Sequence, residues 1–524
     1  MNGDQPLLQQ ISELLRAARR LYTDGGPAAT LALAVDRLEE PLRVAIAGRV
    51  KAGKSTLLNA LVGQDLAATD AGECTRIVTW YRDGITYQLM LHPRSGPARQ
   101  VPFARSGPAT AIDLDGLAPE DVDRLVVDWP SPALRDMTLI DTPGMGSMST
   151  GLSEHTESLL APEGDGASTA DAVIYLMRHM HSFDVRFLEA FHDEPAQRWP
   201  MNTIGVLARA DEVGHARLDA LSAAHRIAAR YRDDHRVRRL CQTVIPVAGL
   251  LAASGASLRQ AEYRSLEILA AGGQEAQRLL VSADRFVNEA TSLEVLPAER
   301  ALLLERFGMY GVRVGIDLIR TGQVTSATDL SRQFLRYSGL DELRQLLANR
   351  FAARAGVLKA RSALLTLEQV VREFPHPEGE ALLRDLEQFR AGAHEFAEVE
   401  LSDRLRTGHV SVGADGSAER AERLLGAEGI DDRSRLGLPP GASESEVMAA
   451  VREALSSWQR RSEDPTAPRE HREAARVLVR TCEGILVRHL DGQSEAVAPA
   501  VPSPTSSAQP DQHRVEAARA PVAE

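Results

Sequence analysis

The residues with the clearest chemistry form a glycine-bounded loop, residues 48–55, which fits the pattern G-x-x-x-x-G-K-[ST]. An apolar run ends just before this loop, and a helix-like sequence follows it. In this setting the glycines let backbone N–H groups face the phosphates of a nucleotide, and the helix dipole adds to the attraction. A glycine-rich turn without a ligand is the alternative. We expect nucleotide contacts from Gly48, Val50, Lys51, Ala52, Gly53, Lys54, Ser55 and Thr56.

Side chains of this loop and of a second motif have the chemistry of a Mg²⁺–nucleotide site. Lys54 should reach the β- and γ-phosphates, and Ser55 should offer its hydroxyl to Mg²⁺. The sequence D-T-P-G at 141–144 follows another apolar run. The carboxylate of Asp141 can hold Mg²⁺ through water, and Gly144 can donate its N–H to the γ-phosphate. A plain turn is the alternative. Between the two motifs, Thr75 is the best candidate for a switch threonine that ligates Mg²⁺.

Lysine is rare in this chain, because only Lys51, Lys54 and Lys359 are lysines among 60 basic residues. The loop pattern requires Lys54 but not Lys51, and lysine and arginine present their charge differently. We therefore predict a catalytic role for Lys51, which would supply positive charge to the transferring phosphoryl group, as an arginine finger does elsewhere. A chance lysine on a solvated loop is the alternative.

A third motif indicates which base is bound. After an apolar run, residues 208–211 read A-R-A-D, where GTPases usually carry N/T-K-x-D. Asp211 can accept hydrogen bonds from N1–H and N2–H₂ of guanine, which adenine does not offer together, and the stem of Arg209 can stack on the base. Ala208 lacks the usual polar side chain, so guanine preference stays open. Ala248, after the next apolar run, is a further candidate for a base contact.

Composition and charge exclude several classes of protein. The chain has 524 residues, more than one core usually supports, and a formal charge of −13, which argues against nucleic-acid binding. The three cysteines have neither disulfide nor zinc spacing, and no secretory signal or apolar run of about 18 residues is present. A ribosome-associated or metal-trafficking GTPase would need a basic module or a Cys/His cluster. We expect a cytoplasmic protein.

The elements that must position these residues follow an α/β pattern. Short apolar runs bounded by turn residues predict a mostly parallel sheet up to about residue 250, and residues 78–91 resemble a hairpin that turns at Asp83-Gly84. Long helices are expected afterwards, at 358–374, at 382–405, after a capping box at Ser443 and Glu446, and at 469–490. One interpretation of these helices is a bundle that only stabilises the rest of the protein.

These patterns divide the chain into four parts. We expect N-terminal helices over 1–40, interrupted at 25–27 and packed into a stalk. A P-loop GTPase domain follows over 41–350, with a helical extension from about 251. The helical stalk covers 351–491, and a disordered tail rich in Pro, Ala, Ser and Gln covers 492–524.

The motif set G-x-x-K-A-G-K-S-T-L-L-N-A-L, T-R at 75–76, D-T-P-G at 141–144 and R-A-D-E at 209–212 resembles the bacterial dynamin-like GTPases, most closely their actinobacterial group. The resemblance implies Mg²⁺-dependent conversion of GTP to GDP, coupled to movement of a stalk. Two departures are Lys51, where animal dynamins keep a serine that helps to bind a monovalent cation, and Ala208, where they carry a polar residue.

The same resemblance implies a biological setting. It suggests membrane remodelling by fission or fusion, with the division septum as one place of action, and a homo- or hetero-oligomer with a second dynamin-like protein. The chain would associate peripherally with the inner face of the cell membrane, either directly through a tip such as residues 436–439 or through its partner. The alternative is a nucleotide-gated scaffold of a division complex with slow hydrolysis.

Overall fold

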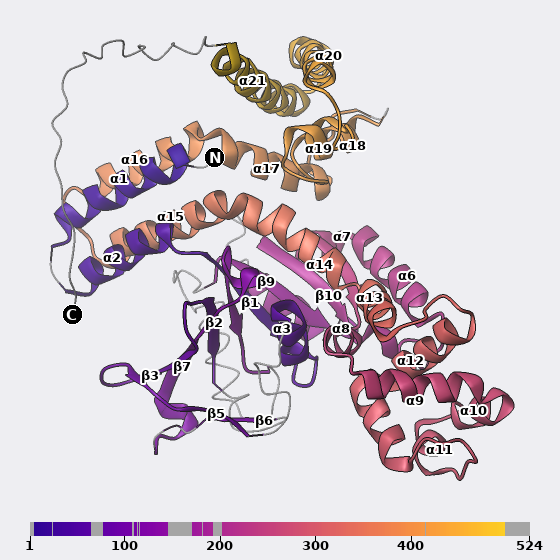
Figure 1. The fold of residues 1–524 in the computed structure, drawn as a ribbon. Helices are drawn as coiled ribbons and strands as arrows, with labels where there is room; N and C mark the ends of the chain where they lie inside the picture. Colours follow the sequence, from indigo (N-terminus) through magenta and orange to yellow (C-terminus); the bar gives the residue numbers. More distant parts are fainter. Residues whose placement is uncertain are drawn as a thin grey trace, which may run out of the picture.

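A computed structural model describes residues 5–23, 25–63, 77–106, 109–112, 114, 116–144, 170–180, 182–191, 202–413 and 416–497. An α/β domain occupies the centre, a helical extension lies on one side of it, and a long helical arm lies across its top in the view of Figure 1. The predicted fold class, a mostly parallel α/β domain with a helical stalk, is confirmed.

The central sheet has nine strands in the order β11-β10-β9-β1-β8-β2-β7-β3-β4. The five strands from β11 to β8 pair in parallel. Parallel sheets are covered on both faces, and every residue of β9 and β10 is buried, which explains their continuous apolar sequences. The bounds are β1 Leu42–Gly48, β2 Thr79–Asp83, β3 Gln88–Pro93, β4 Arg99–Gln100, β7 Val122–Trp129, β8 Met137–Asp141, β9 Ala172–Met177, β10 Thr203–Ala208 and β11 Thr243–Val247, with a separate pair of β5 Phe103–Ser106 and β6 Ala109–Ile112.

The hairpin predicted over residues 78–91 is wrong in its pairing. β2 and β3 both form, but β7 lies between them in the sheet. β2 pairs with β7 in parallel and β3 pairs with β7 antiparallel. The turn at Asp83-Gly84 therefore leads over the end of β7, and the partner of both strands comes from a later part of the sequence.

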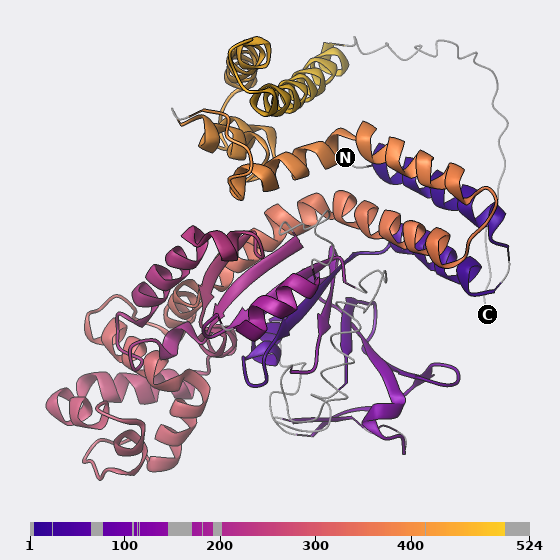
Figure 2. The same ribbon diagram turned by 180° about the vertical axis from the view of Figure 1, so that it is seen from behind.

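Alternating residues of the central strands feed two apolar cores, one on each face of the sheet. Ala45 and Ala47 of β1 belong to the core covered by α5 and α6, whereas Val44 and Ile46 belong to the core covered by α3 and by α14 (Leu340–Leu346). Figure 2 shows the face that carries α5 and α6. The helices of the domain are α3 Lys54–Val62, α5 Ser182–Phe191, α6 Ala220–Asp233, α7 His235–Arg238 and α8 Gly249–Ala256.

After β11 the described residues contain helices and no further strand. Helices α9 to α13 of the extension share the apolar core on the α6 side of the sheet, whereas its last helix, α14, belongs to the core on the α3 side. Its longest helix is broken by Gly308, which has a φ of 62°. The helices are α9 Gln260–Ala271, α10 Gly273–Leu279, α11 Ala283–Asn288, α12 Pro297–Arg320, α13 Ala327–Tyr337 and α14 Leu340–Leu346.

The helical arm contains two apolar clusters. The first joins the N-terminal helices to the helices that follow the domain and includes Leu15, Leu31 and Leu367. The second is formed by the C-terminal helices and includes Trp458 and Leu478. The helices of the arm are α1 Gln5–Leu21, α2 Gly25–Glu39, α15 Ala355–Glu373, α16 Gly379–Gly392, α17 His394–Arg406, α18 Ser417–Leu424, α19 Asp432–Leu436, α20 Glu444–Glu463 and α21 Arg469–Val497.

Several predicted helix limits in the arm are wrong. The helix predicted over 382–405 is two helices, because Ala393 has an extended backbone with ψ of 116°. The predicted break of the N-terminal segment into two helices is present, although it lies between Leu21 and Gly25, so that residues 25–27 form the first turn of α2. α21 continues to Val497, past the predicted start of the tail, and residues 498–524 lie outside the described residues. The predicted capping box at Ser443 and Glu446 is present at the start of α20.

Two sets of polar contacts lie where the arm meets the base of the α/β domain. The carboxylate of Asp171, just before β9, accepts hydrogen bonds of 2.9 Å from Arg37 of α2, Ser362 of α15 and the backbone N–H of Arg43. Lys359 of α15 donates to the carbonyl oxygens of Leu38 and Glu40 at 2.6 and 3.0 Å. This lysine therefore satisfies carbonyl groups at the end of α2, where cations are stabilised.

Candidate functional site

The phosphate loop lies between β1 and α3, at the edge where the parallel strands end. Gly48 has a φ of 146°, and a Cβ atom there would lie 2.5 Å from the carbonyl oxygen of Leu176 in β9. Gly53 precedes α3 with a φ of 97°. Only glycine satisfies both positions, so the motif glycines are required by backbone geometry as well as by ligand access.

Lys51 also has a left-handed backbone, with a φ of 61°, although it is not a glycine. Such a conformation costs about 1–2 kcal/mol for a residue with a Cβ atom. The side chain is exposed on the outer surface of the loop, next to Val50, which is also exposed. Strain of this kind persists where the surrounding structure imposes it, and it is concentrated at ligand sites.

Lys54 is buried and points back over the loop. Its Nζ atom donates to the carbonyl oxygens of Gly48 at 3.2 Å and Arg49 at 3.4 Å. Burial lowers the pKa of Lys54, and the nearby Asp141 partly offsets this effect. The ammonium group is thus held among loop carbonyls, where a phosphate would give it a stronger partner.

Ser55 and Asp141 meet beside the loop. The Ser55 hydroxyl donates to Oδ2 of Asp141 at 3.1 Å, while the buried Oδ1 has no hydrogen-bond partner among the described residues. Burial raises the pKa of Asp141 to about 6, against the opposing effects of Lys54 and Ser55. A buried carboxylate oxygen without a partner, next to a hydroxyl, is a suitable donor set for a hard cation such as Mg²⁺.

Gly144 touches the phosphate loop itself. A Cβ atom at this position would lie 2.7 Å from Cα and 2.8 Å from Cγ2 of Val50. The neighbouring Thr142 fixes the motif by donating its hydroxyl to the carbonyl oxygen of Ile46 in β1 at 2.9 Å. The D-T-P-G motif and the phosphate loop are therefore in direct contact, which a plain turn does not require.

A cavity of about 160 Å³ opens beside the loop, at the ends of β10 and β11. Its lining includes Asp211, Arg209 and Ala208 of the third motif. Asp211 is buried, and burial raises the pKa of its carboxyl, with the nearby Glu212 adding to the effect. The other lining residues are Ala52, Gly53, Thr56, Leu57, Leu176, Val206, Glu212, Val247, Gly249 and Leu250. We name this space the base cavity.

The wall of the base cavity contains an ion-pair chain that the sequence analysis missed. Glu212 pairs with Arg209 at 2.7 Å and with Arg178, just after β9, at 3.1 Å. Arg209 has a left-handed backbone with a φ of 54°. The pairing holds the Arg209 guanidinium against Glu212, a second residue of the cavity lining. No local sequence signal indicates Arg178, because its pairing with Glu212 requires β9 and β10 to lie side by side.

One predicted residue is placed differently, and another lies outside the described residues. Ala248 does not line the base cavity; it is buried, and its N–H donates to the carbonyl oxygen of Ser338 at 2.8 Å. Its neighbours Val247 and Gly249 form that wall instead. Thr75, predicted as the switch threonine, lies outside the described residues.

The predicted tip at residues 436–439 is anchored to the arm. Leu436 packs against the C-terminal apolar cluster, and the N–H of Leu438 donates to the carbonyl oxygen of Arg433 at 2.8 Å. The apolar Leu436 of that loop therefore has a structural role, which is to anchor the loop to the arm. Among the described residues, no helix is both long and apolar enough to cross a bilayer.

Comparison with known proteins agrees with this geometry. Residues 44–210 match the Dynamin family. Over 452 residues the chain is 39% identical to the isoniazid-induced protein IniC of Mycobacterium tuberculosis, covering 86% of this chain and 91% of that protein.

Two further relatives match shorter segments. The isoniazid-induced protein IniA of the same organism is 31% identical over 163 residues, 28% of this chain and 24% of that protein. A bacterial dynamin-like protein of Nostoc punctiforme is 32% identical over 114 residues, 20% of this chain and 16% of that protein. The family predicted from the motifs is confirmed, and the chain is a bacterial dynamin-like GTPase that belongs to the dynamin family.

Proposed function

We propose that this chain uses Mg²⁺-dependent GTP hydrolysis to move its helical arm, and that this movement remodels a membrane by fission or fusion. The cytoplasmic face of the cell membrane at the division septum is the proposed place of action. One observation carries this proposal: a nearly continuous helical run from residue 340 to residue 373 links the nucleotide site to the arm.

The start of this run contacts two elements, α3 and β11, that lead to the proposed nucleotide site. Arg344 of α14 donates to the carbonyl oxygens of Ala60 and Leu61, near the end of α3, at 2.9 and 3.4 Å. Gly339, which caps α14, approaches the carbonyl oxygen of Pro246 in β11 so closely that a Cβ atom would lie 2.4 Å from it. α3 begins at the phosphate loop and β11 ends at the base cavity.

The run then continues into the arm without an intervening loop. A π-helical turn over Leu347–Phe351 and a 3₁₀ turn over Ala352–Arg354 connect α14 to α15. A shift of α3 or β11 between nucleotide states would therefore move α15 and the helices packed on it. Rigid elements with contacts at both ends are the physical basis of such coupling.

The proposed roles of the site residues follow from their positions. Lys54 would bind the β- and γ-phosphates, and Ser55 and Asp141 would hold Mg²⁺, with Thr75 as a further ligand. Mg²⁺ would neutralise negative charge on the phosphates. Gly144 would donate its N–H to the γ-phosphate, since it already contacts the loop at Val50. Lys51 would direct positive charge toward the transferring phosphoryl group.

Guanine recognition is proposed for the base cavity. The ionised carboxylate of Asp211 would accept hydrogen bonds from N1–H and N2–H₂ of the base. The Arg209 stem, held by Glu212, would cover one face of the ring. Ala208 would add no side-chain hydrogen bond, so selectivity would depend on Asp211. The contact proposed for Ala248 would be indirect, through Val247 and Gly249.

The arm and the oligomer form the rest of the proposal. The GTPase domain would span residues 41–350, and the arm would combine residues 1–40 with 351–491, consistent with the shared apolar cluster of α1, α2 and α15. A second dynamin-like chain is proposed as partner, since the sequence resembles both IniC and IniA of one organism. Membrane contact would be peripheral and partly supplied by that partner.

Co-sedimentation with phosphatidylglycerol–cardiolipin vesicles tests this function. We expect the purified chain, alone or with its partner, to bind and deform vesicles with a non-hydrolysable GTP analogue and to release them with GDP. Lys54→Ala should bind neither nucleotide nor vesicles in this cycle. Retention by a partner protein without any effect on vesicles would instead support the alternative, a nucleotide-gated scaffold.

A further inference from the structure

The segment that follows β10 and carries the third motif has an unusual backbone. Among the described residues, the non-glycine residues with a positive φ are Lys51 of the phosphate loop, Arg209, His215 and Ala216. His215 and Ala216, with φ of 64° and 57°, come directly after Gly214, with φ of 62°. Consecutive residues of this kind are rare, because a Cβ atom makes the conformation unfavourable. We name residues 214–216 the positive-φ turn.

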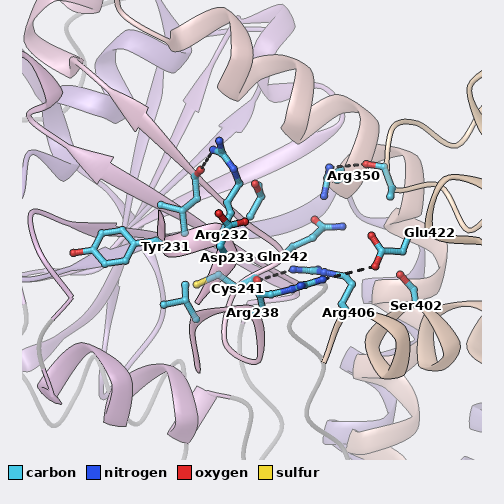
Figure 3. Close-up of a pocket in the computed structure, with 14 residues that line it drawn as sticks. Tyr231, Arg232, Asp233, Arg238, Cys241, Gln242, Arg350, Ser402, Arg406 and Glu422 are labelled. Carbon is cyan, nitrogen blue, oxygen red and sulfur yellow. Dashed lines mark hydrogen bonds and ion pairs between the residues drawn. The ribbon is translucent and has the colours of Figure 1, made fainter. Parts of the chain in front are cut away.

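The positive-φ turn connects two elements whose other ends are fixed. It follows a 3₁₀ turn, Ala210–Glu212, which contains Asp211 and lies at the end of β10, and it precedes α6. β10 is held in the sheet between β9 and β11. The last turn of α6 is anchored to β11, because Arg232 donates to the carbonyl oxygen of Val244 at 2.7 Å (Figure 3). The conformation of the positive-φ turn therefore affects where the chain between β10 and α6, including Asp211, is placed.

Arg313 of α12 holds the positive-φ turn from the side of the helical extension. Its Nη1 atom donates to the carbonyl oxygens of His215 at 2.9 Å and Ala216 at 2.7 Å. Its Nε and Nη2 atoms donate to the carbonyl oxygen of Leu280, just after α10, at 3.2 and 2.7 Å. One planar guanidinium thus binds three carbonyl groups, a geometry that the single ammonium group of a lysine does not reproduce.

The same helix also lies beside Asp211 itself. α12 breaks at Gly308, whose φ of 62° and ψ of 173° belong to a region that essentially only glycine adopts. A Cβ atom there would lie 3.7 Å from Oδ2 of Asp211 and 3.5 Å from Cδ2 of Leu250, and both residues line the base cavity. The Ser254 hydroxyl of α8 donates to the carbonyl oxygen of Arg306, next to the break. α12 therefore runs along the base-recognition segment, beside Asp211 and at the positive-φ turn.

Ala208 leaves this segment without one of its usual fixed points. GTPases usually carry Asn or Thr at this position, whereas the methyl group of Ala208 forms no hydrogen bond. The ion pair of Arg209 and Glu212 is exposed, and exposed ion pairs contribute little to stability. Support for the segment must therefore come from elsewhere, and α12 is in contact with it.

We propose that Arg313 is a positioning residue for guanine recognition. By binding the carbonyl groups of the positive-φ turn, it offsets the steric cost of that turn and keeps the Asp211 carboxylate in the wall of the base cavity. The helical extension then determines base selectivity together with the α/β domain. This role rests on the guanine site proposed above, and it involves neither the membrane nor the arm.

Base selectivity measures the position of Asp211. GDP offers N1–H and N2–H₂ to this carboxylate, whereas inosine diphosphate offers N1–H alone. In calorimetric titrations of the full-length protein with Mg²⁺, we expect the wild type to bind GDP about tenfold more tightly, since a hydrogen bond to a charged group is lost with inosine diphosphate. Arg313→Gln should weaken GDP binding about tenfold and inosine diphosphate binding about threefold, so that the selectivity falls to about threefold.

A double substitution shows whether Arg313 acts through Asp211. Asp211→Ala should bind the two nucleotides within about twofold of each other, and adding Arg313→Gln should weaken GDP binding by less than about twofold more. Two effects that add in full would overturn the positioning role. Selectivity that Arg313→Gln leaves unchanged would overturn this role alone. Equal binding of both nucleotides by the wild type would overturn the guanine site and the role of Arg313 with it.

Glycine in the turn separates the positioning role from the contact with Leu280. His215→Gly and Ala216→Gly remove the steric cost of a positive φ. Added together to Arg313→Gln, they should restore the selectivity to within about twofold of the wild type. They do not repair the lost contact with Leu280. A selectivity that stays low would therefore mean that Arg313 only joins α10 to α12, which would overturn the proposal.

Two further variants complete the test. Arg320→Gln, on the same helix, removes a guanidinium that pairs with Asp317 on the exposed surface, and it should leave both affinities unchanged. Arg313→Lys keeps the charge and the stem, and hence the fold, but lacks the planar donor fork, so an intermediate selectivity is expected. Thermal unfolding without nucleotide shows that each variant is folded.

Steady-state hydrolysis gives an independent measurement. For Arg313→Gln, KM for GTP should rise about tenfold while kcat at saturating GTP stays within about twofold of the wild type, because no group at the phosphates is removed. A fall in kcat at unchanged KM would contradict a role in base recognition and overturn the assignment of Arg313.

Discussion

Ser55 donates its hydroxyl hydrogen to Asp141 at 3.1 Å and thereby joins the start of α3 to the end of β8. The other carboxylate oxygen of Asp141 is buried without a partner among the described residues. The two donors that a metal would use are therefore already adjacent. Little rearrangement of the protein is needed for a cation to bind.

Asp141→Asn tests this arrangement. The amide cannot supply a second anionic oxygen, so we expect Mg²⁺ affinity, measured in the presence of GDP, to fall about 10- to 100-fold. GDP binding without Mg²⁺ should change little, because the phosphate loop is intact. Asp136→Asn, an exposed residue upstream, is the matched control. Unchanged Mg²⁺ affinity in Asp141→Asn would remove this residue from the metal site.

Lys51 is tested by separating its backbone from its charge. Lys51→Gly relieves the positive φ, so the free energy of unfolding should stay equal or rise by up to about 1 kcal/mol. GTP hydrolysis should nevertheless fall about 100-fold, as for loss of one charge-stabilising donor. Lys51→Arg keeps the charge and should retain most activity. Normal hydrolysis by Lys51→Gly, with normal GDP affinity, would show that the lysine has no catalytic task.

How far the sequence predicts the site depends on how local each feature is. Residues 48–55 contain their own glycines, lysine and serine, so a single stretch of sequence specifies the loop. The contact between Gly144 and Val50 is not local, but the strand before each motif places both at one edge of a parallel sheet. The motif and the strand before it were therefore sufficient to predict that these two loops lie close together.

The features that the sequence analysis predicted wrongly or missed depend on contacts between distant parts of the chain. The pairing of β2 and β3 is decided by β7, which inserts between them. Ala248 follows a strand as predicted, but Ser338, from the helical extension, takes its N–H. The pair of Arg178 and Glu212 requires β9 and β10 to lie side by side in register. None of these partners can be identified from local spacing.

Gly144→Ala tests the contact between the two motifs. The added Cβ atom would meet the Val50 backbone, so the two loops must separate. We expect the free energy of unfolding to fall by about 1–3 kcal/mol and GTP hydrolysis to fall more than GDP affinity. Gly441→Ala, where nothing lies within 4 Å of the new atom, is the control. Equal effects of the two substitutions on hydrolysis would contradict this role of Gly144.

Asp403 of α17 gives the arm a pH-dependent stability. Burial raises its pKa from 3.8 to about 6, although Arg406 and Arg239 oppose the shift. The folded state therefore favours the protonated carboxyl. The stabilisation of the fold by this protonated carboxyl is fully present below pH 3.8 and is lost as pH rises through about 6. Asp403→Asn, which imitates the protonated form, should be more stable than the wild type by about 1–2 kcal/mol at pH 7.5.

The measurement for Asp403 is urea unfolding of both proteins between pH 5 and 7.5. The difference in free energy of unfolding should shrink toward pH 5, because the wild-type carboxyl then becomes protonated. Asp385→Asn, on the exposed face of α16, should show no such trend. A difference that is independent of pH would mean that the Asp403 carboxyl is ionised across this range.

Arg344→Gln tests the link between the nucleotide site and the arm. Loss of the guanidinium should free α14 from Ala60 and Leu61 while the phosphate loop stays intact. We expect GDP affinity and basal GTP hydrolysis within about twofold of the wild type, because no group of the site is removed. The nucleotide-dependent change in distance between α3 and α21, followed by fluorescence transfer between attached dyes, should fall by about half or more. Arg332→Gln on the exposed surface of α13 is the control. A full distance change in Arg344→Gln would mean that movement of the arm is driven through another contact, with the Asp171 cluster at the base of α2 and α15 as the next place to test.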